Sequence, residues 1–151
     1  MSIGEVCNRE VVVTDVGATI QAAVKLMREH HVGDIVVVER RGDRRVPVGM
    51  VTDRDIVVEV LAEDVDPKAL TVRDVMSTPV VTVRSDEELA VAIGLMRSHG
   101  VRRIPVVNAE GGLEGIVSVD DILELVAEQI NGLVSLIRIE QQREQKRRSG
   151  S

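Results

Sequence analysis

The sequence has no phenylalanine, tyrosine or tryptophan among its 151 residues. The core must therefore be aliphatic, and no aromatic ring is available to stack on the base of a ligand. Basic residues are also fewer than acidic ones: the chain has 19 Lys and Arg and 25 Asp and Glu, which gives a formal net charge of −6. That is the wrong sign for binding a phosphate backbone by counterion release, so composition argues against a nucleic-acid-binding protein.

Long apolar runs, a signal peptide and disulfides are missing as well. No apolar stretch approaches the roughly 18 residues that cross a bilayer, and the N-terminus does not follow the pattern of a secretory signal. Cys7 is the only cysteine, so no disulfide framework can form. These features predict a cytoplasmic protein with no membrane partner. The apolar fraction of 44% is still sufficient for a core.

What the sequence does contain is an internal repeat. The segment "LMREHHV" begins at Leu26 and "LMRSHGV" at Leu95, a shift of 95 − 26 = 69 residues. The same shift aligns two further pairs of segments, "DIVVV" (34–38) with "RIPVV" (103–107) and "SIGEVC" (2–7) with "TVRDVM" (71–76). The phrases "GMVTDRDI" (49–56) and "GIVSVDDI" (115–122) correspond at a shift of 66, because the second copy is three residues shorter in a turn.

Each copy is predicted to have the order β-α-β-β-α. A short β-branched run, 11–14 or 80–83, is followed by a helix, which in the second copy begins with a capping box of Ser85 and Glu88. A last helix begins near Asp53 and near Asp120. The strands at 34–39 and 103–108 are so uniformly apolar that both of their faces should be covered. The segments 46–52 and 113–118 are predicted to pair back on them as hairpin strands.

A half of about 60 residues leaves apolar surface open when it stands alone. We therefore expect the two halves to pack around a pseudo-twofold axis as one folding unit with two related clefts. The predicted fold class is α/β (α+β), with repeat 1 at 2–62, a linker at 63–70, repeat 2 at 71–130 and a C-terminal extension at 131–151.

The repeated phrase places a hydroxyl and an acid where a strand enters a helix. Thr52 and Ser118 lie near a helix N-terminus, which favours an anion such as phosphate. Asp55 and Asp121 follow about one helical turn later, and a carboxylate that accepts two hydrogen bonds suits the vicinal hydroxyls of a ribose. Simple helix capping explains the same residue types. For one copy capping is the better interpretation, whereas the repetition of the spacing favours a ligand site.

Other chemistry has weaker support in the sequence. His30, His31 and His99 raise the possibility of a metal-binding protein, but His30 and His99 occupy equivalent helix ends, where a histidine interacts well with the helix dipole. Cys7 corresponds to Met76 in the repeat, which favours an apolar wall over a nucleophile. No catalytic triad order or glycine-rich phosphate loop stands out, so we do not expect an enzyme.

The duplicated β-α-β-β-α order, with "VRDVMSTPVVTV", "HGVRRIPVV" and "GIVSVDDI", resembles the CBS (cystathionine β-synthase) domain family. Two such repeats resemble a stand-alone CBS pair, also called a Bateman module, and the resemblance covers residues 2–130. It implies an adenosyl ligand, such as AMP, ADP, ATP or S-adenosylmethionine, in the clefts between the repeats.

The resemblance also implies roles for individual residues. Asp55 and Asp121 would hold the ribose, while Thr52 and Ser118 approach the phosphate. The adenine would lie against aliphatic walls, made of Met76, Val81 and Val101 for the Asp55 cleft and of Cys7, Val12 and Val32 for the Asp121 cleft.

The two halves differ in charge. Family members reach phosphates from the positions of Arg102 and Arg103, where the first repeat has Gly33 and Asp34. Arg54 likewise stands one residue before Asp55, whereas Asp120 precedes Asp121. Since arginine pairs with a phosphate and aspartate repels it, the Thr52/Asp55 cleft is predicted to be the better site for a charged nucleotide.

These features together predict a regulatory module, a homodimer that senses an adenosyl ligand and acts on an unknown effector protein in trans. The alternatives are a structural adaptor without a ligand and a metal-binding protein. The extension carries apolar residues in steps of three and four, Ile122, Val126, Ile130, Leu133 and Ile137, and either covers the module's own core or, as we favour, packs on a second subunit. The tail at 141–151 is predicted to be disordered.

Overall fold

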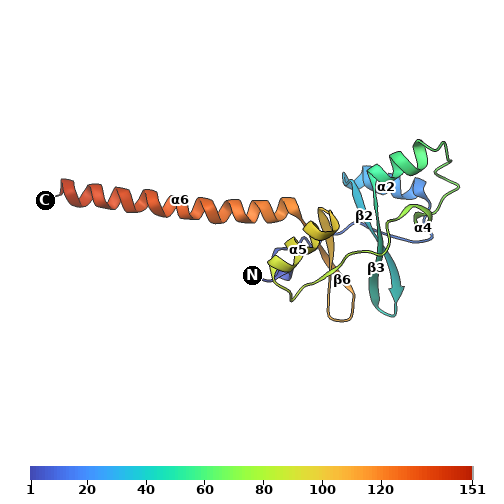
Figure 1. Ribbon diagram of the computed structural model, residues 1–151, viewed down its shortest axis with the longest axis horizontal. Helices are drawn as coiled ribbons and strands as arrows, with labels where there is room; N and C mark the ends of the chain where they lie inside the picture. Colours follow the sequence, from blue (N-terminus) through green and yellow to red (C-terminus); the bar gives the residue numbers. More distant parts are fainter. Residues whose placement is uncertain (151) are drawn as a thin grey trace. The chain divides into compact units, whose positions relative to one another are not determined.

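The computed structural model describes residues 1–150. The chain divides into two units, one running from Met1 to Val117 and the other from Ser118 to the C-terminus. The first unit contains two three-stranded sheets with their helices, and the second is essentially one long helix (Figure 1). No helix within residues 1–150 combines the length and apolarity needed to cross a membrane.

The strands of each repeat form a separate sheet. The first sheet has the order β1 (Val13–Asp15), β2 (Asp34–Arg41) and β3 (Arg44–Thr52), with β1 parallel and β3 antiparallel to β2. The second sheet repeats this order with three strands, of which β4 pairs in parallel with β5; they are β4 (Val83–Arg84), β5 (Arg103–Val107) and β6 (Leu113–Ser118).

The helices complete the predicted order β-α-β-β-α in both repeats, which confirms the predicted fold class. A short helix also opens each repeat. In chain order the helices are α1 (Ile3–Val6), α2 (Ile20–His30), α3 (Asp53–Ile56) continuing into the π-helix η1 (Val57–Leu61), α4 (Val72–Val75), α5 (Leu89–His99) and α6 (Val119–Ser149). Because α6 continues to Ser149, the structure differs from the predicted disordered tail at 141–151.

Local sequence explains where the two central helices begin and end. In α2, the Thr19 hydroxyl accepts a hydrogen bond from Ala22 N at 3.1 Å, and His31 closes the helix in the left-handed conformation with φ 54°. The predicted Ser85–Glu88 capping box at α5 is wrong. Ser85 N instead donates to Val107 O, and Glu88 becomes the N-cap residue, so the helix begins three residues later than expected.

The core is aliphatic, as the composition requires. The four successive valine and isoleucine residues at 35–38 of β2 are all buried, so both faces of this strand are covered. Side chains at helical spacing on α2 pack against them, with Ile20 and Ala23 fully buried. The same cluster includes Val72 of α4, a residue from the start of the second repeat. The hydrophobic core of the first repeat is therefore completed by a segment of the other repeat.

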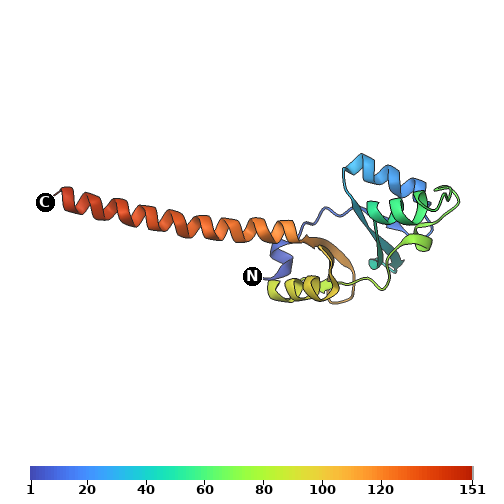
Figure 2. The same ribbon diagram turned by 45° about the horizontal axis from the view of Figure 1, so that its top comes forward.

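The two repeats exchange their first segments. Helix α4 bonds to the first repeat through Val72 N, which donates to Ala18 O at 2.8 Å. Helix α1 bonds to the second repeat through Ile3 N, which donates to Glu87 O at 2.9 Å. Figure 2 shows the blue α1 beside the yellow-green α5, and the green α4 near the first sheet. With the repeat shift of 69, these two bonds are equivalent, so the exchange is reciprocal.

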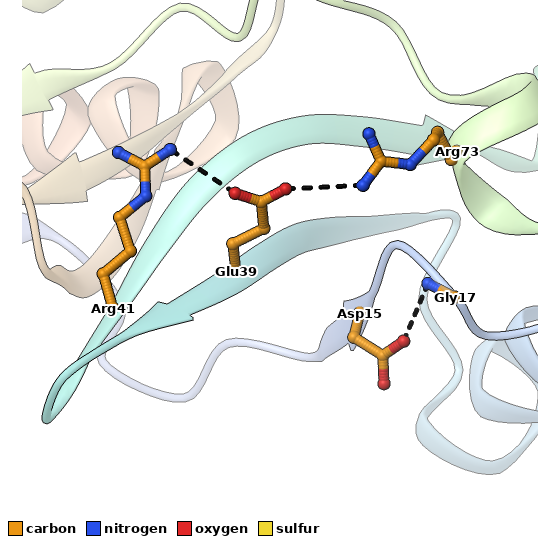
Figure 3. A network of polar contacts seen from close by, with 5 residues as sticks. All are labelled: Asp15, Gly17, Glu39, Arg41 and Arg73. Carbon is orange, nitrogen blue, oxygen red and sulfur yellow. Dashed lines mark hydrogen bonds and ion pairs between the residues drawn. The ribbon is translucent and has the colours of Figure 1, made fainter.

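A surface ion pair also connects α4 to the first repeat. Glu39 of β2 lies between Arg41, at 3.4 Å, and Arg73 of α4, at 3.5 Å (Figure 3). In the same view Asp15 accepts a hydrogen bond from Gly17 N and shapes the turn after β1. Such exposed pairs contribute little stability individually, so burial of α4 remains the main connection.

Candidate functional site

The repeated phrase in the first repeat forms a reciprocal helix cap. Thr52 ends β3 and precedes α3, and its hydroxyl accepts a hydrogen bond from Asp55 N at 3.1 Å. Asp55 Oδ2 in turn accepts from Thr52 N at 3.0 Å. Both residues are half-buried. The capping interpretation is thus realised in this structure, while the second carboxylate oxygen of Asp55, Oδ1, takes no part in the cap.

The phrase in the second repeat has one of the two capping bonds. Ser118 is the N-cap residue of α6, and its hydroxyl accepts from Asp121 N at 3.1 Å. Ser118 is buried and Asp121 is half-buried. The hydroxyl-and-acid spacing therefore produces the same local backbone contact in both copies.

The glycine that opens each phrase is required by a crossing segment from the other repeat. A Cβ atom on Gly49 would lie 2.6 Å from Met76 Sδ and 3.0 Å from Ser77 O. A Cβ atom on Gly115 would lie 2.8 Å from Cys7 Sγ and 2.7 Å from a backbone oxygen of the same crossing segment. Met76 and Cys7, two of the residues predicted for adenine pockets, are therefore packed against the phrases predicted to bind the rest of the ligand.

The environment of Cys7 gives a testable expectation for its reactivity. Burial raises the pKa of the Cys7 thiol; Arg9 opposes this effect and Glu114 adds to it. We expect the thiol to react with a disulfide reagent at neutral pH more slowly than free cysteine, with a rate that rises only at higher pH. The rate should be measured from pH 6 to 10, with urea-unfolded protein as the control. Equal rates in folded and unfolded protein at pH 7 would contradict the burial of this thiol.

An ion pair joins the two repeats at equivalent positions. Arg103 Nε lies 2.5 Å from Asp34 Oδ2. Residue 34 plus the shift of 69 gives residue 103, so each partner contacts its own counterpart. That is the geometry expected beside a pseudo-twofold axis. Asp34 also pairs with Thr52 across β2 and β3, which brings Arg103 close to the first phrase.

A groove lies next to this ion pair. Val12 and Val32 line an inner cavity of about 90 Å³ together with Asp34 and Arg103. The same two valines continue into an open groove of about 530 Å³ that reaches His30. This volume is within the range of small-molecule sites, and the lining is mainly aliphatic.

A half-buried acid, Asp34, makes the inner cavity electrostatically unusual. Burial raises the pKa of the Asp34 carboxyl above its ordinary value, the Arg103 guanidinium opposes this, and Asp53 adds to it. Asp53 is held nearby because Asp53 N donates to Gly33 O at 2.8 Å. The carboxylate that neutralises Arg103 is thus itself partly desolvated, which disfavours its charged form.

The predicted site residues are therefore only partly brought together. Val12, Val32 and Arg103 share one groove, while Met76 and Cys7 lie at the two phrase glycines. The remaining predicted residues do not line this groove: Thr52, Asp55, Ser118 and Asp121 form the two helix caps, Arg54 and Arg102 are exposed, and Val81 and Val101 are half-buried. Sequence reasoning missed the role of Asp34 as a partner of Arg103, although the repeat alignment places the two residues at equivalent positions.

The histidines are dispersed. His30 lines the open groove, His31 ends α2, and His99 Nδ1 lies 3.1 Å from Leu95 O. Among residues 1–150 no three potential metal ligands of the His, Cys, Asp or Glu type come together.

Comparison with known proteins identifies the family. The CBS domain family matches residues 3–62 and again residues 72–128. The chain therefore belongs to the CBS domain family and contains a tandem CBS pair. Both matched segments together cover most of the chain, which confirms the resemblance found in the sequence.

Curated relatives share this architecture. An uncharacterized protein of Methanopyrus kandleri, MK0525, is 39% identical over 128 residues, which are 83% of this chain and 62% of that protein. The CBS domain-containing protein YhcV of Bacillus subtilis is 37% identical over 80% of this chain and 82% of its own length. The chain thus spans less than two thirds of the first relative and most of the second.

Solved structures support the same fold. A hexameric CBS-CP12 protein from bloom-forming cyanobacteria is 35% identical, with a TM-score of 0.70 over 82% of this chain and 69% of that one. Hypoxic Response Protein I, solved with two coordinated zinc ions, is 31% identical, with a TM-score of 0.71 over 82% and 98%. The cytosolic domain of the Mg²⁺ channel MgtE in complex with ATP is 29% identical, with a TM-score of 0.70 over 82% and 48%.

Proposed function

We propose that this CBS pair is a regulatory module that binds an adenosyl ligand, such as AMP, ADP, ATP or S-adenosylmethionine, and has no catalytic activity of its own. The observation that carries the proposal is the convergence of aliphatic walls and one arginine on a groove beside the first phrase. Val12 and Val32 supply the walls and Arg103 the cation. The ATP complex of the related MgtE domain supports this class of ligand.

The proposed binding mode assigns the groove to the Thr52/Asp55 phrase. Asp34 connects the two features, since it lines the cavity and pairs with Thr52 across the sheet. Val12 and Val32 would then enclose the adenine, Asp55 Oδ1 would accept from the ribose hydroxyls, and Arg103 would approach the phosphate. This arrangement moves the two valines from the Asp121 cleft, where the family resemblance placed them, to the Asp55 cleft.

The proposed output is a change in how the two repeats are held together. Arg103 comes from the second repeat and the valines from the first, so a ligand that contacts both would favour one arrangement of the repeats. A partner protein, or a second copy of the chain, would distinguish the liganded from the empty arrangement. The hexameric CBS-CP12 relative is consistent with CBS pairs acting in assemblies.

Isothermal titration with AMP, ATP and S-adenosylmethionine tests the proposal. We expect Asp55→Ala to weaken binding at least about 10-fold, since hydrogen bonds to a charged group contribute roughly 1.5–3 kcal/mol. Asp121→Ala should have a smaller effect, because the Asp55 cleft is the proposed nucleotide site. The matched control is Asp74→Ala, which removes the same kind of cap from Thr71 of α4.

The outcomes separate the candidate functions. Equal losses for Asp55→Ala and Asp121→Ala would contradict the preference for one cleft. No heat and no thermal shift with any of these ligands would favour a structural adaptor, since a ligand at 100 times its Kd stabilises a protein by about 2.7 kcal/mol. Zinc found by elemental analysis of the purified protein, and lost in His30→Ala, would favour a metal site instead.

A further inference from the structure

A cavity lies beside the hairpin that joins β2 and β3. Its volume is about 460 Å³, which is within the range of small-molecule sites. We call it the hairpin cavity. It is lined by six residues from all three strands of the first sheet: Val13, Thr14, Asp15, Val38, Arg40 and Arg45. Of these residues only Val13 also lines the groove proposed for the adenosyl ligand. Arg40 stands six residues beyond Asp34 on β2, about 20 Å away at 3.3 Å per residue.

The hairpin brings four arginines together in two cross-strand pairs. The pairs, directly opposite each other in the register, are Arg40–Arg45 and Arg41–Arg44. Like charges at opposite positions destabilise a pair of strands. The second pair is compensated, because Arg41 contacts Glu39 at 3.4 Å and Arg44 donates to Glu110 O. Neither side chain of the first pair has a hydrogen bond or an ion pair within residues 1–150. The two uncompensated arginines are the two that line the hairpin cavity.

The sheet does not need these arginines in order to form. The corresponding turn of the second repeat, "NAEGGLE" (108–114), contains no Lys or Arg, and β5 and β6 still lie side by side. Solubility does not require them either, since the formal net charge of the chain is already −6. An anion that enters the hairpin cavity would remove the repulsion between Arg40 and Arg45.

The other end of the hairpin cavity offers a hydrogen-bond acceptor. Asp15 of β1 pairs with Val38 of β2, and Arg40 follows two residues later on the same face of the sheet. Asp15 Oδ1 accepts from Gly17 N at 2.9 Å, whereas Oδ2 has no partner in the part of the chain that the structure describes (Figure 3). The acceptor and the arginines are therefore about 7 Å apart along the strand, at 3.3 Å per residue.

We infer that the hairpin cavity binds a small phosphate ester that carries a hydroxyl group. One arginine fork already matches the two oxygens of a carboxylate, whereas a phosphate ester offers three oxygens and nearly two negative charges to two arginines. Asp15 repels the phosphate and accepts from the hydroxyl, so it sets the orientation of the ligand. Val13 and Val38 supply an apolar lining for its carbon chain. This inference does not depend on the proposed adenosyl ligand.

Titration of the isotope-labelled full chain with glycerol 3-phosphate, at constant ionic strength, tests the inference. We expect saturable changes in the amide chemical shifts of residues 13–15, 40 and 45. Arg40→Gln and Arg45→Gln should each weaken binding at least about 10-fold, since each removes a charge-assisted contact. The control is Arg41→Gln, which removes the same charge from the opposite face of the hairpin and should leave the affinity unchanged. All three arginines are exposed, so the variants should fold.

Three results would overturn the inference. One is the absence of any saturable change at millimolar ligand. Another is an equal loss of affinity in Arg40→Gln and Arg41→Gln, which would show that the ligand responds only to the net charge of the hairpin. The third is a set of changes confined to residues 33–34 and 52–55 and lost in Arg103→Gln. The anion would then bind in the adenosyl groove, and the proposed function would stand without a second site.

Methyl phosphate, which lacks a hydroxyl on its carbon, tests the role of Asp15. We expect it to affect the same residues but to bind about 10-fold more weakly than glycerol 3-phosphate, because it makes no hydrogen bond to Asp15 Oδ2. Equal affinities for the two compounds would show that the hairpin cavity recognises phosphate alone and would reject the hydroxylated ligand.

Discussion

Replacing Gly115 with alanine is expected to destabilise the protein by about 2–3 kcal/mol. The new methyl group would lie 2.7 Å from Asn8 O and 2.8 Å from Cys7 Sγ. The backbone oxygen cannot simply rotate away, because Asn8 O accepts from Ile116 N at 2.8 Å and Asn8 N donates to Ile116 O at 2.9 Å. Overpacking of this kind costs about 1–3 kcal/mol, and strain on a backbone bond adds about 1 kcal/mol.

Urea unfolding of three variants measures this effect. Gly49→Ala should cost less than Gly115→Ala, because its closest neighbour is the flexible end of Met76. Gly94→Ala is the control, since its added methyl group meets nothing within 4 Å in the middle of α5. It should stabilise the protein by about 1 kcal/mol through helix propensity. A Gly115→Ala midpoint equal to that of wild type would refute the crossing of residues 7 and 8 over β6.

The repeat could be predicted from the sequence because each copy repeats both the pattern and the spacing. The strand β6 has the predicted bounds 113–118, and β5 begins at the predicted Arg103. The first strand of each repeat begins later than expected. Val11 and Val12 were assigned to a strand from their β-branched side chains, but the ladder with β2 begins at Val13, although Val12 O already accepts a hydrogen bond from Val36 N at 3.1 Å. Composition favours an extended backbone without determining where the hydrogen bonds of a sheet begin.

The exchange of segments between the repeats was not predicted. Residues 2–7 and 71–76 were assigned to the repeats that follow them in the chain, whereas α1 packs on the second repeat and α4 on the first. Such long-range contacts leave no periodic signal in the sequence. The glycine at the start of each phrase indicates a close approach of other atoms without identifying them. The family resemblance added that Met76 belongs to the Asp55 cleft and Cys7 to the Asp121 cleft, without giving the helices that carry them.

The candidate site, like the fold, could be predicted only in part. Its cap geometry follows from local sequence, since Thr52 and Asp55 stand three residues apart. The contact between Asp34 and Arg103 depends on the packing of one repeat on the other, and the family resemblance had suggested only that Arg103 was available for phosphate. In the structure Asp34 already pairs with it. Under the proposed function, the affinity for an anionic ligand would therefore depend on this acid as much as on the arginine.

Replacing Asp34 with asparagine is expected to strengthen the binding of an anionic nucleotide about 10-fold, and Arg103→Gln to weaken it about 10-fold. In wild type the phosphate must compete with the Asp34 carboxylate for the Arg103 guanidinium. A charge-assisted hydrogen bond contributes roughly 1.5–3 kcal/mol, and we take the lower end because the Arg103 side chain is 41% exposed. Binding of S-adenosylmethionine, which has no phosphate, should change much less in both variants.

Titration of the protein with nucleotide at several pH values separates the competition between Asp34 and the phosphate from a general effect of net charge. Burial raises the pKa of Asp34, so this carboxyl takes up a proton at a higher pH than an ordinary aspartate and its protonation is favoured by folding. As the pH falls through that raised pKa, wild type should approach the affinity of Asp34→Asn, and the difference between them should shrink. The matched control is Arg41→Gln, which breaks the exposed ion pair with Glu39 at the far end of β2, about 23 Å away at 3.3 Å per residue. If Arg41→Gln and Arg103→Gln weaken nucleotide binding equally, Arg103 has no direct contact with the phosphate and acts only through the net charge of the module.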